Sequence, residues 1–167
     1  MRLISLLFIL SLSGGVAHAG LDVECINGDC LTYGWDIMDM KSGNNSSIEC
    51  LELDCMSEGW VSVYKNQDQV EVRCKANGCF ENGWRAYDAR TGRQIADATC
   101  LRSFADGSDC LKNGWETRDV NVGRYVTRCQ FDDCTRFGWE TRAPGYQPTI
   151  ARCKEGGCFQ AGWTTRP

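Results

Sequence analysis

The side chains most able to do chemistry in this 167-residue chain are its twelve cysteines. Thiolates act as nucleophiles, bind zinc, and oxidise in pairs to disulfides. Here two cysteines five positions apart are followed, after three further residues, by a Gly-Trp pair. The arrangement recurs at residues 25–35, 50–60, 74–84, 100–115, 129–139 and 153–163, and it contains every cysteine and all six tryptophans of the chain.

The start of the chain indicates where these cysteines reside. Arg2 precedes the apolar run 3–12, which is too short for a membrane span, and Ala17-His18-Ala19 offers small residues at a cleavage site. We therefore expect a signal peptide at residues 1–19 and a single mature domain at residues 20–167, secreted or periplasmic and without a membrane span. An uncleaved membrane anchor is the alternative.

Export favours disulfides over the other chemistries of cysteine. The single histidine, His18, lies in the predicted signal peptide, so Cys–His zinc sites, haem attachment and histidine-based catalysis have no residue to use. CxxC redox motifs are also missing from the sequence. We expect no metal site and no cofactor.

The fourth copy indicates how the cysteines pair. Its five extra residues all lie between Cys100 and Cys110, while the second half of the motif keeps its spacing. An insertion tolerated there indicates a surface loop whose ends are held together. This favours a disulfide within each copy, with bridges between neighbouring repeats as the alternative. The predicted pairs are Cys25–Cys30, Cys50–Cys55, Cys74–Cys79, Cys100–Cys110, Cys129–Cys134 and Cys153–Cys158.

The segments that position these cysteines have the pattern of short hairpins. β-Branched residues follow each tryptophan and precede each first cysteine, with Gly, Asn or Pro turns between them. Asp or Gly stands just before each second cysteine and a glycine closes the segment, which predicts one helical turn capped at both ends. A strand with a glycine bulge is the alternative.

Alternation along the strands assigns the core. Tryptophan and the residue two positions later face inward, as does the residue two positions before each first cysteine. The predicted structural core is Trp35, Trp60, Trp84, Trp115, Trp139 and Trp163.

Six such units predict an all-β fold of tandem disulfide-stapled hairpins. An integer number of repeats lets the strand at Leu21 pair with the strand at Trp163 and close a ring or barrel of about twelve short antiparallel strands. An open hairpin stack is the alternative.

The net charge of the predicted mature chain limits the classes of partner that it can bind. Residues 20–167 carry 17 basic and 22 acidic residues, a net charge of −5, which makes nucleic acid an improbable partner. Five arginines recur at equivalent places in the last three repeats and are candidate ligands for an anion or an acidic polysaccharide; an ordinary solvated face is the alternative. They are Arg118, Arg142, Arg166, Arg128 and Arg152.

These observations favour a non-enzymatic binding or interaction module with a protein partner or an envelope-structural role. A lectin-like alternative stacks sugars on the repeated tryptophans and requires these rings to be exposed. A small carboxylate-based hydrolase is less favoured, because no acidic pair stands apart from the repeat pattern.

Overall fold

The computed structural model describes residues 20–64, 69–76, 78–103 and 107–166. The predicted signal peptide, residues 1–19, lies outside this range. In the described part of the chain, no helix combines the length and the apolar character needed to cross a membrane.

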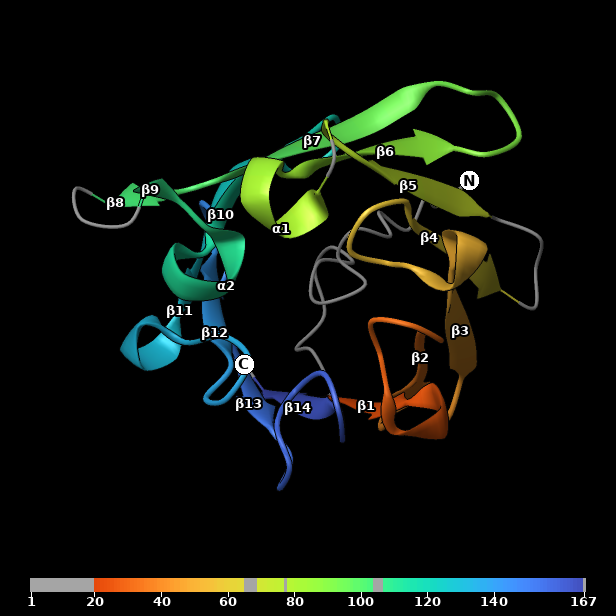
Figure 1. Cartoon of the computed structure of the whole chain (residues 1–167), viewed down its shortest axis with the longest axis vertical. Coiled ribbons are helices and arrows are strands. Elements are labelled where there is room, and N and C mark those ends of the chain that lie inside the picture. The colour runs from red at the N-terminus through yellow and green to blue at the C-terminus, as the bar shows by residue number, and fades with distance from the viewer. Residues whose placement is uncertain (1–19, 65–68, 77, 104–106, 167) are drawn as a thin grey trace.

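Twelve strands of the described chain form one closed antiparallel barrel. In Figure 1 the repeats follow one another around a ring, from the red-orange first repeat to the blue last one. The strands are β1 (Leu21–Cys25), β2 (Trp35–Asp39), β3 (Asn45–Cys50), β4 (Gly59–Tyr64), β5 (Val70–Cys74), β6 (Trp84–Asp88), β7 (Gln94–Cys100), β10 (Trp115–Asp119), β11 (Gly123–Cys129), β12 (Trp139–Arg142), β13 (Thr149–Cys153) and β14 (Trp163–Arg166).

The barrel closes where the first strand meets the last. β1 pairs with β14 through Asp22 opposite Thr164 and Val23 opposite Trp163, and the two strands lie side by side in Figure 1. The predicted closure is therefore confirmed, and the open stack is wrong. Closure is favourable because the pairing of β1 with β14 gives hydrogen-bond partners to backbone groups that an open sheet would leave unpaired at its edges. One feature was not predicted: β8 (Arg102–Ser103) and β9 (Gly107–Ser108) form a separate hairpin in the long cystine loop.

All six disulfides join cysteines of the same copy, as predicted, so the alternative of bridges between repeats is wrong. Their Cα atoms lie 4.4–4.7 Å apart. The second cysteine of each copy is fully buried. In three copies the short loop between the cysteines is a 3-10 turn: η2 (Ile26–Gly28), η3 (Leu51–Leu53) and η4 (Gln130–Asp132).

The predicted helical turn follows each second cysteine. It is a regular helix in α1 (Cys79–Asn82) and α2 (Cys110–Asn113) and a turn in the other repeats. In four repeats the aspartate before the cysteine accepts hydrogen bonds from the backbone N–H groups two and three residues later, which satisfies donors that a helix start leaves unpaired. These aspartates are Asp29, Asp54, Asp109 and Asp133.

The glycine of each Gly-Trp pair lets two backbones approach closely. A Cβ atom built on these glycines would lie 2.0–2.1 Å from a carbonyl oxygen of the neighbouring strand, and every one of them has a positive φ. At the ends of α1 and α2, Gly83 and Gly114 have φ of 90° and 87° with ψ near 180°, a region that only glycine adopts readily. The six glycines are Gly34, Gly59, Gly83, Gly114, Gly138 and Gly162.

The barrel interior is filled as the alternation predicts. The residues two positions before each first cysteine are at most 1% exposed: Val23, Ile48, Val72, Ala98, Thr127 and Ala151. In the last three repeats the inward residue after tryptophan is a buried threonine, and the hydroxyl oxygens of Thr127 and Thr141 lie 2.8 Å apart. Paired hydroxyls allow a polar residue to be buried at small cost.

Candidate binding surfaces

The six tryptophans form a closed ring inside the barrel. Each indole contacts the indoles of both neighbouring repeats, with centroids 5.2–6.1 Å apart and planes tilted by 56–61°. Their exposed fractions are 2–8%, so the predicted core is confirmed. The hypothesis that these rings stack on sugars is wrong for the same reason, because a buried indole offers no face to a ligand.

Backbone hydrogen bonds join neighbouring repeats at one end of the barrel. The backbone N–H of the second cysteine in one repeat donates to the carbonyl of the preceding repeat, at the residue directly after that repeat's own second cysteine. Five of these hydrogen bonds are 2.7–3.0 Å long, and one of them, from Cys30 to Phe159, crosses the seam between the first and last repeats. This end, which we call the cystine end, therefore has a rim of five hydrogen bonds between neighbouring repeats.

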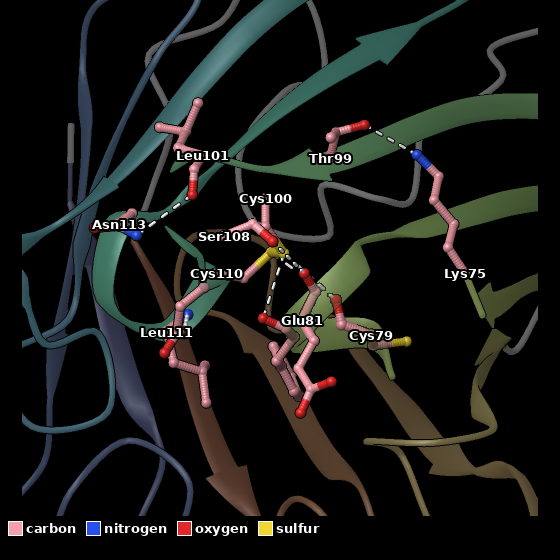
Figure 2. The surroundings of a disulfide bond; sticks show 12 residues. Lys75, Cys79, Glu81, Thr99, Cys100, Leu101, Ser108, Cys110, Leu111 and Asn113 are labelled. Carbon is pink, nitrogen blue, oxygen red and sulfur yellow. Dashed lines mark hydrogen bonds between the residues drawn. A yellow bond between two sulfur atoms is a disulfide. The ribbon is translucent and has the colours of Figure 1, made fainter. Parts of the chain in front are cut away.

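Figure 2 shows the rim at the fourth disulfide. The Sγ atoms of Cys100 and Cys110 lie 3.8 and 3.9 Å from the carbonyl oxygen of Cys79 in the preceding repeat. Ser108, from the inserted loop, donates to the carbonyl of Glu81 over 3.1 Å. The inserted loop of the fourth repeat is thus hydrogen-bonded to the third repeat, and it extends the rim outward.

The residues that follow the second cysteines converge on the ring axis. Phe80 and Phe159 belong to repeats three positions apart, yet their ring centroids are only 5.8 Å apart. Each also packs edge-on against the tryptophan of its own repeat at 6.3 Å. Apolar side chains therefore occupy the axis at the cystine end, above the tryptophan ring.

A pocket of about 600 Å³ opens at this end between the fifth and sixth repeats. Its position follows from small residues: Thr135 stands where the other five repeats carry Leu, Met or Phe, and Gly156 and Gly157 have no side chains to fill the space. The lining combines an apolar floor with polar walls: Leu31, Leu111, Thr135, Arg136, Phe137, Lys154, Glu155, Gly156, Gly157, Phe159 and Gln160.

Two exposed phenylalanines stand beside the pocket. Phe131 is 83% exposed, the most of any large apolar residue described, and its backbone is held at a φ of 50°. Its ring packs edge-on against Phe137 at 5.2 Å, and the guanidinium of Arg136 lies 5.2 Å from the Phe137 centroid. We call Phe131, Arg136 and Phe137 the aromatic rim. The equivalent residues Asn27, Glu52 and Ala76 share this left-handed backbone, so the exposed aromatic ring is what distinguishes the fifth copy.

The two cations of the pocket have different environments. Lys154 binds Asp22 at 2.7 Å and Glu24 at 3.3 Å, across the seam of the barrel. Burial disfavours its charge, but the hydrogen bonds to these carboxylates outweigh burial and raise the pKa of Lys154. Arg136, by contrast, forms no ion pair with any residue of the described ranges. Arg136 is therefore the cation that remains available to a ligand.

The five arginines singled out by the sequence all lie exposed on the outer wall. Strand register does not bring them into one cross-strand row: Arg142 lies opposite Val126, Arg166 opposite Ile150, Arg128 opposite Glu140 and Arg152 opposite Thr164. Arg118 alone has another arginine, Arg124, directly opposite. Anion binding by the set of five stays a prediction.

The aromatic rim and the pocket were not predicted from the sequence. The signal that could have found them is departure from the repeat: Thr135 replaces an apolar residue, and Phe131 stands where other copies carry Asn27, Glu52 or Ala76. Both departures lie in the fifth copy, four positions apart, but without the ring geometry nothing indicates that they border one pocket.

Acid–base and metal chemistry find little support in the described residues. The carboxyl groups with shifted pKa values all have lowered ones; in Asp133 the Thr135 hydroxyl is the main cause, and in Glu116 the Arg124 guanidinium. A lowered pKa keeps a carboxylate ionised, whereas a general acid needs a raised one. Across the same residues, no group of three or more His, Cys, Asp or Glu side chains is placed to hold a metal ion.

Comparison with known proteins finds no matching family model, no similar curated protein and no similar solved structure.

Proposed function

We propose that this protein is a non-enzymatic, exported protein-interaction module that binds a partner protein at the aromatic rim and the pocket beside it. The observation that carries the proposal is Phe131, 83% exposed on a left-handed backbone, packed against Phe137 at the mouth of the pocket. Exposed aromatic and arginine side chains at the edge of an apolar pocket are typical of the residues that dominate binding energy.

The rigidity of the scaffold supports this role. Six disulfides, the rim of backbone hydrogen bonds and the tryptophan ring fix the cystine end before any partner arrives. A surface that is already ordered loses less entropy on binding than a flexible loop does. The disulfides also fit an oxidising compartment, where a secreted or periplasmic module would act.

Pocket chemistry sets the kind of partner. Leu111, Phe137 and Phe159 give an apolar lining that suits one apolar side chain of the partner. Arg136 has no ion pair among the described residues, and it suits a carboxylate next to that side chain. We therefore expect the partner segment to carry an apolar anchor flanked by an acidic residue.

Site-specific photocrosslinking tests the proposal. A photoreactive residue at position 137 is expected to crosslink one partner protein from the material that surrounds the exported protein, whereas one at position 53 is not. Leu53 is the control: like Phe131 of the aromatic rim it is exposed, apolar and at a positive φ in a cystine loop, but it lies in the second repeat. Equal crosslinking at both positions would contradict a specific site.

Two further variants connect the crosslink to the pocket. Thr135→Met places in the fifth repeat the residue that the second repeat carries as Met56, so the fold should accept it while the pocket fills. We expect this variant and Arg136→Glu to abolish the crosslink at position 137. With the purified partner, Phe137→Ala should weaken binding by about 2 kcal/mol or more, as at other hot spots; an unchanged affinity in all three variants would overturn the proposal.

A further inference from the structure

A row of arginines runs across the outer wall of the barrel and shares no residue with the pocket at the cystine end. Register places Arg73 opposite Arg85, Arg85 opposite Asp97, Asp97 opposite Arg118, and Arg118 opposite Arg124. These five residues, which we call the arginine row, come from five adjacent strands, β5, β6, β7, β10 and β11. At a strand spacing of about 4.8 Å the row is about 19 Å long.

The cations of the row lie above the carboxylates that bind them. Side chains of the four arginines are 53–79% exposed, whereas those of Glu71, Asp97 and Glu116 are 19–33% exposed. Five cations, including Lys75 beneath Arg85, share these three carboxylates. A molecule approaching the wall therefore meets guanidinium groups first, and the cluster keeps a surplus of positive charge.

The geometry of these ion pairs leaves donors for a ligand. Arg85 binds Asp97 through Nε at 3.3 Å, and Arg118 binds Glu116 through Nε at 3.5 Å. A guanidinium has five N–H donors, and a carboxylate bound at the Nε edge leaves the outer N–H groups of the terminal nitrogens directed away from it. Arg73 is also held in place, by Glu71 at its own Nε and by the ring of Tyr87 at 5.4 Å.

The row has a cost in the unliganded protein. Like charges directly opposite each other on a sheet are destabilising, and the row contains two such pairs, Arg73 with Arg85 and Arg118 with Arg124. An anionic ligand offsets this repulsion between arginines by placing negative charge beside them. Guanidinium groups also pair with sulfate, phosphate and carboxylate groups more specifically than lysine does.

We propose that the arginine row binds a linear acidic polysaccharide whose sulfate or carboxylate groups pair in turn with Arg73, Arg85, Arg118 and Arg124. The row is one side chain wide, and the next row along the wall contains Glu49 and Glu71. A single polysaccharide chain is narrow enough to lie along the arginines without contacting those carboxylates. A nucleic-acid duplex is wide and anionic over its whole surface, so the carboxylates would repel it. The chain's net charge of −4 also opposes duplex binding away from the row.

The test titrates the purified protein with heparin as the sulfated probe, alginate as the carboxylate probe and duplex DNA, each at several salt concentrations. Tight heparin binding with weak alginate binding identifies sulfate as the recognised group, and comparable binding identifies a general acidic-polysaccharide site; both results support the proposal. No binding to either polysaccharide at low salt would overturn it, as would DNA binding at least as tight as that of the better polysaccharide.

Matched variants locate the binding. Arg85→Gln with Arg118→Gln removes two charges from the row, and Arg90→Gln with Arg93→Gln removes two from the exposed turn between β6 and β7, outside the row. The first variant should weaken polysaccharide binding about 10-fold or more and reduce the slope of log K against log salt by about one per arginine. The second double variant should change the polysaccharide affinity and the salt slope only slightly. Equal losses in the two variants would overturn the proposal, and matching unfolding midpoints would show that the fold is intact.

Discussion

At the scale of single residues, the repeated glycine is the position that tolerates least change. Its φ is positive and a Cβ would collide with the carbonyl oxygen of the next strand, so conformation and space exclude a side chain independently. The sequence predicted this glycine as the end of a helical turn or as a bulge, and both favour a positive φ. It could not show that both apply together, because the close approach depends on how the glycine's strand pairs with its neighbouring strand.

Gly114→Ala should therefore destabilise the protein strongly. Alanine there would adopt φ near 87° and place its Cβ 2.1 Å from the Thr127 carbonyl oxygen, for an expected cost of about 3 kcal/mol or more. Gly92→Ala is the control, because Gly92 also has a positive φ but nothing within 4 Å of its Cβ, which predicts a cost of about 1 kcal/mol. Urea unfolding of both variants measures the difference; equal losses would show that the collision is relieved.

At the scale of elements, hairpins, helical turns and disulfides were predictable because each depends on local spacing. β-Branched runs between turn residues predict strands, and Asp before cysteine predicts a cap, without knowledge of the rest of the chain. The hairpin β8–β9 was missed because two-residue strands contain no period to detect. The pocket was missed because it depends on three small residues, Thr135, Gly156 and Gly157, that meet only after the ring has closed.

The capping aspartates predict a specific loss of stability in acid. A hydrogen bond from the Thr32 hydroxyl lowers the pKa of Asp29, the Ser57 backbone N–H lowers the pKa of Asp54, and the Thr135 hydroxyl lowers the pKa of Asp133. Their contribution is complete above the ordinary pKa of 3.8 and is lost as the pH falls through the lowered pKa of the folded state. The free energy of unfolding should therefore fall below about pH 4.

Replacing Asp29, Asp54 and Asp133 together by asparagine separates this effect from general acid denaturation. Asparagine caps a helical turn about as well as aspartate but does not titrate. The triple variant should keep most of its stability at pH 7 and lose less of it than the wild type on acidification, as measured by urea unfolding at each pH. A parallel loss in both proteins would mean that other carboxyl groups cause the acid response.

At the scale of the whole molecule, the ring makes all six repeat junctions similar. The seam between β1 and β14 has strand pairing at two positions, the hydrogen bond from Cys30 to Phe159, and the tryptophan contact of Trp35 with Trp163 at 5.8 Å, which are the three kinds of contact found at most other junctions. The seam is therefore closed by the same kinds of contact as the junctions within the chain. This was predictable from the integer repeat number, whereas the asymmetric surfaces were not.

Circular permutation tests this equivalence. Joining Arg166 to Gly20 through a short Gly-Ser linker and opening the chain between Gly145 and Tyr146, in an exposed turn, should preserve the barrel. Unfolding free energies of the two forms should differ by about 2 kcal/mol or less. Deleting residues 149–166 instead exposes the edges of β1 and β12 and should abolish the near-ultraviolet circular dichroism of the tryptophan ring. A permutant that fails to fold would show that the seam is special.

The closed ring also restricts how such a protein can grow. A linear repeat array lengthens by one unit without disturbing the units already present, because each contacts only its neighbours. In this barrel a seventh hairpin would change the curvature at every junction and spread the indoles apart around a wider centre. Extra sequence is accommodated instead where it leaves the circumference unchanged, as in the loop between Cys100 and Cys110, so new features can be added to the rim one loop at a time.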